Sequence, residues 1–231
     1  MENDDPGGSR PRLAKGARVG SKFDEAIVFV VDDDVSIRES LELLIRSAGW
    51  TPETYASARE FMDRAPPEVA NCLILDVNLP DLNGLDLQKL VAVERTEMPI
   101  IFVTGYGDIP TTVKAMKAGA VEFLPKPLHD ETLLEAIEDA LERSGDELSR
   151  AAEMRLLRER HASLTQRERE VMALVVRGLL NKQVAYELGI SEITVKAHRG
   201  QVMRKMNARS LPDLVKLAAR LGHPASTDSS S

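Results

Sequence analysis

From residue 27 to about residue 141, short apolar runs alternate with amphipathic stretches. This alternation is typical of strand–helix units repeated around a mainly parallel sheet. Several of the apolar runs are rich in Val and Ile, as strands covered on both faces are. Five strands are predicted, at residues 27–31, 51–55, 72–75, 100–103 and 121–124.

A helix is predicted after each strand, at residues 36–48, 57–65, 85–93 and 110–118 and from residue 130 onward. In the first of these, Leu41 and Ile45 share one face at helical spacing. Gly49 and Gly119 follow the first and fourth helices, where glycine commonly ends a helix. Pro110 suits a first helical turn.

Beyond Arg143 the pattern changes. Ser144 and Gly145 interrupt the apolar periodicity, and residues 147–161 are highly charged with few apolar positions. We interpret this stretch as a linker that is helical in large part; it could continue the preceding helix or be flexible. Residues 164–221 indicate four helices separated by short turns. The predicted organisation is a disordered tail (1–23), a first domain (24–142), a helical linker (143–161), a second domain (162–222) and a disordered tail (223–231).

The composition is that of a soluble globular protein, with 43% hydrophobic and 29% charged residues among 231. No run approaches the ~18 apolar residues of a membrane span, so no membrane partner is expected. The N-terminal residues lack the apolar centre of a secretory signal. The single cysteine, Cys72, lies in an apolar run and is predicted to be a core residue of a cytoplasmic protein.

The net charge of −7 conceals two halves of opposite sign. Residues 23–142 carry nine basic and 24 acidic side chains, whereas residues 161–222 carry 11 basic and five acidic ones. The basic half could neutralise nucleic-acid phosphates, and the acidic half is better suited to binding cations.

Polar residues stand where the predicted strands end. Asp32 and Asp33 end the first strand, Asp76 the third and Thr104 the fourth, and Lys126 follows the fifth. The carboxyl ends of parallel strands form one crevice, so these side chains are expected to meet. Carboxylates packed this closely repel each other unless a cation lies among them. A hard divalent ion with oxygen ligands fits such a site, and Mg²⁺ is the natural candidate. One carboxylate could then attack phosphorus while the lysine and hydroxyl hold phosphate oxygens.

At these positions the sequence resembles the receiver domains of response regulators. The matching segments are VFVVDDD (28–34), LDVNLP (75–80) with Gly84, VTGYGD (103–108) and AMKAGAVEFLPKP (115–127). The resemblance implies an α/β, flavodoxin-like (βα)5 receiver domain with a parallel sheet of order 2-1-3-4-5.

The resemblance also implies roles for individual residues. Asp76 would be the phosphoacceptor, and Asp32, Asp33, Asp76 and the Asn78 backbone carbonyl would organise Mg²⁺. Thr104 and Lys126 would contact the phosphoryl oxygens.

A conformational switch is implied as well, in which Thr104 moves toward the phosphate and the aromatic Phe123 changes rotamer. The plainer interpretation of Phe123 is a core aromatic. Tyr106 could be an exposed loop residue or a contact near the site. Pro127 stands where a cis peptide bond is common in this family.

The basic half has the signals of a helix-turn-helix. Thr165 is predicted to cap one helix with Glu168 in a capping box, Asn181 to cap the next, and Ser191 to cap the third after a turn at Gly189. The apolar residues predicted to pack inside are Val184, Leu188, Ile190 and Val195.

The segments LTQREREVM (164–172) and GLLNKQVAYELGISEITVKAHR (178–199) resemble the LuxR or NarL type of DNA-binding domain, an all-α four-helix fold. Its third helix would enter the major groove, with Lys196 near guanine, Ala197 near a thymine methyl, and Arg204 or Lys205 toward phosphates. A solvated helix face is the alternative. Gly200 departs from many relatives, which carry a longer side chain there. The predicted DNA-binding residues are Lys182, Ser191, Thr194, Lys196, Ala197, His198, Arg199, Gly200 and Arg204.

The segments TGYGDIP (104–110) and RSLPDLV (209–215) resemble the FixJ group of this family, which includes regulators of aromatic-compound catabolism. The implied partners are a cognate sensor histidine kinase, promoter DNA, RNA polymerase and a second copy of the chain, bound through the face of the fourth and fifth helices after phosphorylation. Activation of transcription is the expected direction.

No catalysis is expected beyond self-phosphorylation and slow self-dephosphorylation. One rival is an Mg²⁺-dependent phosphohydrolase, but such an enzyme needs a second acid two residues after its nucleophile, where this chain has Asn78. The other is a DNA-binding protein that uses its first domain only to dimerise.

Overall fold

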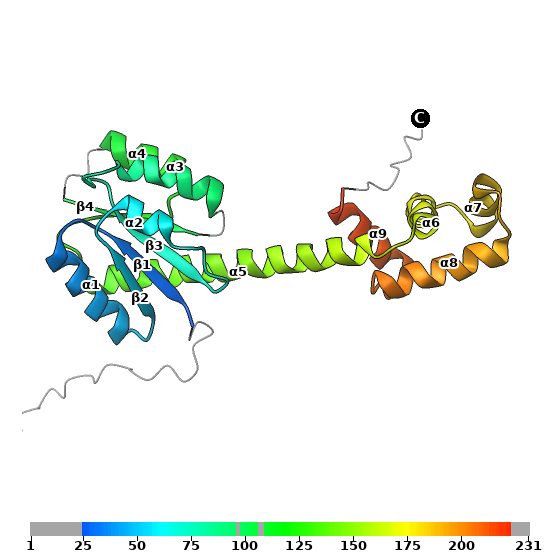
Figure 1. Ribbon diagram of the computed structural model, residues 1–231, viewed down its shortest axis with the longest axis horizontal. Coiled ribbons are helices and arrows are strands. Elements are labelled where there is room, and N and C mark those ends of the chain that lie inside the picture. Colours follow the sequence, from blue (N-terminus) through cyan, green and yellow to red (C-terminus); the bar gives the residue numbers. More distant parts are fainter. Residues whose placement is uncertain (1–24, 96–97, 106–108, 223–231) are drawn as a thin grey trace, which may run out of the picture. The chain divides into compact units, whose positions relative to one another are not determined.

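The computed structural model describes residues 25–95, 98–105 and 109–222. The predicted terminal tails, 1–23 and 223–231, and the predicted loop position Tyr106 lie outside them. The chain divides into two compact units, Met1–Ser144 and Gly145–Ser231 (Figure 1).

The first unit is built on a five-stranded parallel sheet. Its strands are β1 (Ile27–Val31), β2 (Thr51–Tyr55), β3 (Asn71–Asp76), β4 (Ile100–Thr104) and β5 (Glu122–Pro125). Their order in the sheet is β2-β1-β3-β4-β5, as predicted. Strand β1 has β2 on one side and β3 on the other, so the direction in which the chain adds strands changes between β1 and β3. In open sheets of this kind, ligands bind beside that point, at the carboxyl ends of the strands.

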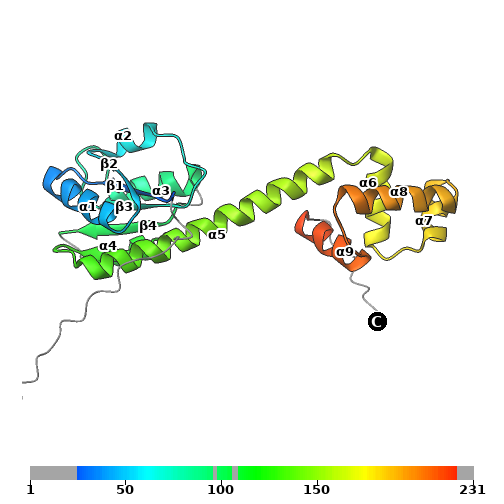
Figure 2. The same ribbon diagram turned by 90° about the horizontal axis from the view of Figure 1, so that it is seen from below.

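Helices cover both faces of the sheet: α1 (Val35–Ser47), α2 (Ala58–Asp63), α3 (Gly84–Glu94), α4 (Ile109–Lys117) and the first part of α5 (Asp130–Ala162) (Figures 1 and 2). Successive strand residues enter different cores. Val28 and Val30 pack with α1 and α5, whereas Phe29 and Val31 pack with α2, α3 and α4. This alternation explains why the central strands are apolar throughout.

Cys72 lies in β3 and is fully buried, as predicted. Burial raises the pKa of its thiol far above the usual range, so the thiolate is not populated near neutral pH.

Helix α5 runs without a break through the point where its apolar periodicity lapses. The Ser144 side chain is fully buried, and its hydroxyl accepts a hydrogen bond of 3.1 Å from the Asn71 N–H at the start of β3. The helix continues through Ser144 and Gly145. Ser144 interrupts the apolar pattern because its hydroxyl is hydrogen-bonded to the backbone of β3. The predicted linker boundaries, 143 and 161, stay a prediction.

The second unit contains the rest of α5 followed by α6 (Gln166–Val176), α7 (Asn181–Leu188), α8 (Glu192–Lys205) and α9 (Leu211–Arg220). Its core includes Leu157 of α5, with Met154 packed against it from the same helix. The other buried apolar residues come from all four later helices, among them Val171, Val175, Val184, Val195, Val202, Met206, Leu214 and Ala218.

The predicted helix ends are largely confirmed. Thr165 and Glu168 form the capping box of α6, Gly189 ends α7 with a φ of 65°, and the Ser191 side chain caps α8. The prediction for Asn181 was wrong, because Leu180 is the N-cap and Asn181 is the first helical residue. The Leu180 N–H is satisfied by the Gln183 side chain instead, at 2.8 Å.

None of the helices in the three described stretches is both long enough and apolar enough to cross a membrane.

Leu157 provides a test of whether the second half of α5 belongs to the second unit. Its side chain is only 3% exposed, whereas that of its neighbour Leu156 is 46% exposed. We expect Leu157→Ala to lower the free energy of unfolding of this unit by about 2–5 kcal/mol, because it leaves a cavity. Leu156→Ala should change it little.

The two units can be followed separately in the full chain, because Trp50, the single tryptophan, is buried in the first unit. In urea, Leu157→Ala should shift the circular-dichroism transition of the helices but leave the midpoint of Trp50 fluorescence unchanged. Equal shifts in both signals would contradict this assignment.

Candidate functional site

Three carboxylates meet at the carboxyl end of the sheet. Asp32 and Asp33 follow β1, and Asp76 is the last residue of β3. One carboxylate oxygen from each lies within 4.8 Å of the other two. Asp32 and Asp76 are buried and Asp33 is exposed, so the cluster is open to solvent on one side. The predicted convergence of these residues therefore occurs.

Lys126 joins two of the three carboxylates. Its Nζ atom lies 2.7 Å from Asp32 Oδ2 and 2.7 Å from Asp76 Oδ2. Burial by itself lowers the pKa of Lys126, but the two carboxylates more than offset that effect, and its pKa is raised. The lysine is therefore a fixed cation at this site.

The other oxygens of Asp32 and Asp76 are held by backbone groups. The Asp34 N–H donates to Asp32 Oδ1 at 2.9 Å, and the Asn78 N–H donates to Asp76 Oδ1 at 3.0 Å. Arg38 of α1 also donates to the Asp32 carbonyl oxygen at 2.6 Å. Each carboxylate is thus oriented at both oxygens.

Thr104 and Phe123 occupy the neighbouring strands. Thr104 ends β4 and is fully buried, and its carbonyl accepts a 2.8 Å hydrogen bond from the Lys126 N–H. Phe123 is half-buried in β5, with its ring centroid 6.1 Å from that of Phe102. The peptide bond between Lys126 and Pro127 is cis, as predicted.

Gly84, the first residue of α3, lies against the backbone of the site. Its N–H donates to the Val77 carbonyl at 2.9 Å, and a Cβ added at Gly84 would lie 2.5 Å from the Asp76 carbonyl oxygen and 3.0 Å from Val77 Cα. Only glycine therefore lets α3 begin against the backbone of Asp76 without a shift.

Asp81 anchors the loop that follows Asp76, and sequence reasoning did not identify it. Its carboxylate accepts hydrogen bonds from the backbone N–H groups of Ala58 (3.3 Å) and Arg59 (3.0 Å) in α2. Burial raises the pKa of Asp81, but hydrogen bonds from backbone N–H groups, including those of Arg59 and Ala58, together lower it more, and the net shift is downward. Neither its type nor its spacing distinguishes it from a solvated loop aspartate, so no sequence signal was available.

In the second unit, α8 has one buried and one exposed face. Val195, Val202 and Met206 are buried in the core. The exposed residues on the other side are Glu192, Ile193, Lys196, Ala197, Gly200 and Arg204. Four of the residues predicted to bind DNA, Lys196, Ala197, Gly200 and Arg204, therefore share an accessible surface.

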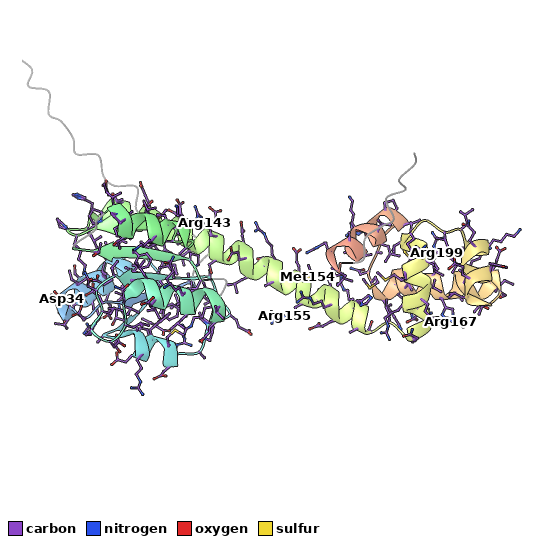
Figure 3. All side chains as sticks on the ribbon, turned by 90° about the horizontal axis from the view of Figure 1, so that it is seen from above. Asp34, Arg143, Met154, Arg155, Arg167 and Arg199 are labelled. Carbon is purple, nitrogen blue, oxygen red and sulfur yellow. The ribbon has the colours of Figure 1, made fainter. Side chains whose placement is uncertain are left out.

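The remaining predicted DNA-binding residues lie at the starts of α7 and α8, or within α8 at partly buried positions. Lys182, in the first turn of α7, is exposed, and His198 is half-buried. The Ser191 and Thr194 hydroxyl oxygens are 2.8 Å apart in the cap of α8. Arg199 (Figure 3) donates to Asn181 Oδ1 of α7 at 3.1 Å, so its guanidinium already takes part in helix packing.

Lys205 does not belong to the accessible surface. It is half-buried, and its Nζ atom lies 2.6 Å from Glu168 Oε2 and 3.1 Å from the Ser163 carbonyl oxygen. Of the two cationic side chains expected to contact phosphates, Arg204 is exposed, whereas Lys205 is paired with Glu168 inside the domain.

Comparisons with known proteins match both units. Residues 28–138 match the response regulator receiver domain, and residues 162–218 match the LuxR family of bacterial regulatory proteins. Nodulation protein W of Bradyrhizobium diazoefficiens is 51% identical over 198 residues, which cover 86% of this chain and 87% of that protein. The chain belongs to the NarL/FixJ family of response regulators.

Other relatives agree with this identification. The response regulator TodT of Pseudomonas putida is 45% identical over 85% of this chain and 86% of its own. The solved structure of the response regulator StyR has a TM-score of 0.78 and 47% identity, covering 85% of this regulator and 99% of StyR. As a response regulator with these two domains, the protein acts with a sensor kinase and DNA.

The close packing at Gly84 of this response regulator can be tested by stability. Gly84→Ala should lower the free energy of unfolding of the receiver domain by about 1–3 kcal/mol, because the added methyl group meets backbone atoms that cannot move independently. Urea denaturation followed by Trp50 fluorescence measures this. Gly105→Ala, where a Cβ meets nothing within 4 Å, is the matched control. Equal stabilities for the two variants would refute the account.

The Glu168–Lys205 pair should make the stability of the DNA-binding domain depend on pH. The hydrogen bond from Lys205 is the main cause of the lowered pKa of Glu168. A carboxyl group with a lowered folded-state pKa stabilises the fold above its unfolded pKa of about 4.3, and loses that effect as pH falls through the folded value.

We therefore expect Glu168→Gln to lower the free energy of unfolding by about 1–3 kcal/mol at pH 7. The difference from the wild type should shrink once pH falls below the unfolded pKa of about 4.3, and should vanish only below the lowered folded-state pKa, where the wild-type carboxyl group is neutral as well. Urea titrations by circular dichroism across this pH range test this, with Glu187→Gln, an exposed glutamate of α7, as the control. A pH-independent difference would argue against the pair.

Proposed function

We propose that Asp76 accepts a phosphoryl group from a cognate sensor histidine kinase and that this modification controls promoter binding by the second domain. The observation that carries the proposal is Lys126 Nζ, 2.7 Å from both Asp32 and Asp76, with Asp33 beside them. A fixed cation next to oriented carboxylates suits a group that must receive a dianionic phosphoryl.

The donor set fits Mg²⁺. Three carboxylates with one lysine leave the cluster negatively charged, and all the available ligand atoms are oxygens, which Mg²⁺ prefers. We propose that Asp32, Asp33, Asp76 and the Asn78 backbone carbonyl hold the ion. When bound, Mg²⁺ would shield the negative charge of the carboxylates from the incoming phosphate oxygens.

The side chains of the chain itself then divide the chemistry. A carboxylate oxygen of Asp76 forms a bond to phosphorus as the bond from phosphorus to the kinase's histidine nitrogen breaks. Lys126 and the Thr104 hydroxyl bind the phosphoryl oxygens. Movement of Thr104 toward them, with a rotamer change of Phe123, is the proposed switch.

Dimerisation after phosphorylation is proposed through the face of α4 and α5. On α4, Ile109, Val113 and Met116 recur at helical spacing with exposed fractions of 81%, 44% and 42%. Such an apolar stripe suits a second copy of the same surface. Paired DNA-binding domains would then occupy two half-sites in the cytoplasm and recruit RNA polymerase to activate transcription.

In the DNA-binding domain, we propose that α8 enters the major groove. Its exposed face would contact bases through Lys196 and Ala197 and phosphate through Arg204. Lys182, Ser191 and Thr194 would contact phosphates at the helix ends, and His198 would lie beside them. Arg199 would reach DNA from its position against α7, and Gly200 would allow close approach of the helix.

The proposal includes no turnover of external substrates, only self-phosphorylation and slow self-dephosphorylation. Asn78 stands where an aspartyl phosphohydrolase would carry its second acid, and its N–H is bound to Asp76. Measurable turnover of phosphate esters would favour that rival.

Asp76→Asn should abolish covalent labelling by acetyl phosphate in the presence of Mg²⁺, because the nucleophilic carboxylate is gone. Asp34→Asn is the matched control. Asp34 is exposed at the start of α1 (Figure 3) and caps it through the Ser36 N–H at 2.8 Å, a role that asparagine also fills. Intact-mass spectrometry of both variants measures the added phosphoryl group. Labelling of Asp76→Asn at the wild-type level would overturn the assignment.

Measuring the affinity of the protein for its operator with and without a phosphoryl donor distinguishes two hypotheses. In one, phosphorylation controls DNA binding; in the other, the receiver domain only mediates dimerisation. We expect tighter binding after phosphorylation of the wild type and no change for Asp76→Asn. Equal affinities in the wild type would favour the second hypothesis.

A further inference from the structure

Ile193 is an apolar side chain that the fold does not use. It lies in the first turn of α8 and is 79% exposed, although the neighbouring Val195 is fully buried. An exposed isoleucine gains nothing from the core of its own domain. Its position on the helix shows what it could contact.

Ile193 begins a stripe that runs along the exposed face of α8. The next residues of the stripe are Ala197, Gly200 and Arg204, at intervals of four, three and four, which place all of them on one side of the helix. Each is exposed, and the buried residues Val202 and Met206 point to the opposite side.

The stripe carries little bulk between its ends. Ala197 has only a methyl group and Gly200 has no side chain, and a Cβ at Gly200 would meet nothing within 4 Å, so packing inside the domain does not require glycine there. A helix face with small residues at its centre can lie close to a partner surface. Ile193 would then be the largest apolar group in the contact.

We propose that Ile193 is a specificity-determining residue that packs against the methyl group of a thymine in the major groove. The inference rests on the proposed placement of α8 in that groove. The thymine methyl is the apolar group among the base edges there, and the first turns of a recognition helix contact those edges. Ile193 would therefore favour an A·T pair at one position of each half-site.

The surroundings of Ile193 favour DNA over a protein partner. The exposed residues next to it on α8 are Glu192, Lys196 and Ala197, and Arg204 ends the stripe. An apolar protein interface would place more than one large apolar side chain on this face. One isoleucine among small and charged residues suits the major groove of DNA instead, where isolated thymine methyl groups are flanked by the phosphates of the two backbones.

The test removes the methyl group from the DNA and the side chain from the protein independently. The operator is first obtained by sequencing DNA retained by the full-length protein in the presence of acetyl phosphate and Mg²⁺. Each thymine is then replaced in turn by deoxyuridine, which differs only in lacking the methyl group. Fluorescence anisotropy gives the Kd of every duplex for wild type and Ile193→Ala.

For the wild type, we expect deoxyuridine at one thymine of each half-site to weaken binding about fourfold, the effect of one buried methyl-sized group. For Ile193→Ala, the same replacement should have no effect, and the affinity for the unmodified operator should be weaker than that of the wild type. Ile193→Val, which keeps the branched Cβ, should retain most of the discrimination.

Val93→Ala is the matched control, because Val93 is also 79% exposed but lies on α3 of the receiver domain. It should show the wild-type response to deoxyuridine. Circular dichroism establishes that each variant is folded, which is expected because Ile193 is not part of the core.

Three outcomes would overturn the inference. These are a wild type insensitive to every deoxyuridine, an Ile193→Ala variant with undiminished methyl discrimination, and an Ile193→Ala variant that binds all duplexes normally but loses transcription, which would indicate a protein partner. Failure of the wild type to retain any specific DNA would instead contradict the proposed function itself.

Discussion

The bridge that Lys126 makes between Asp32 and Asp76 is the interaction on which the receiver site depends. Two buried carboxylates this close repel each other, and Lys126 Nζ, 2.7 Å from an oxygen of each, offsets that repulsion. The lysine follows β5, at one edge of the sheet, whereas Asp32 follows β1 and Asp76 ends β3, which lie inside the sheet. The parallel order of the strands is therefore what assembles the site.

The elements around the bridge hold it from several directions. The backbone N–H groups of Asp34 and Asn78 fix the outer carboxylate oxygens, and the N–H of Lys126 is paired with the Thr104 carbonyl. Gly84 lies so close to the backbone of Asp76 that a side chain at this position would meet the Asp76 carbonyl oxygen. These hydrogen bonds hold both carboxylates in fixed orientations, so the proposed phosphoryl group at Asp76 would meet a site whose backbone is already ordered.

Much of this arrangement could be predicted from the sequence, because strand ends in a parallel sheet are fixed by topology. Apolar runs locate the strands, and polar residues that follow them must meet. What could not be predicted were contacts that depend on side-chain direction. In the sequence, Asp81 cannot be distinguished from a solvated loop aspartate, because its partner N–H groups belong to α2. Lys205 was expected to contact phosphate, because its pairing with the buried Glu168 depends on how α6 and α8 pack. The apolar periodicity of α5 also gave no indication that Ser144 is buried, because its hydroxyl is hydrogen-bonded to the backbone of β3 and not to its own helix.

The participation of α5 in the second hydrophobic core has a practical consequence for dividing the protein. A fragment that begins at residue 162, where the LuxR-family match begins, would lack Leu157 and Met154 and would expose the apolar surface they cover. A fragment that begins at residue 145 would keep both. Isolated DNA-binding domains cut at the shorter boundary would be prone to self-association, and a weak DNA affinity measured on such a fragment would reflect the missing helix rather than the intact regulator.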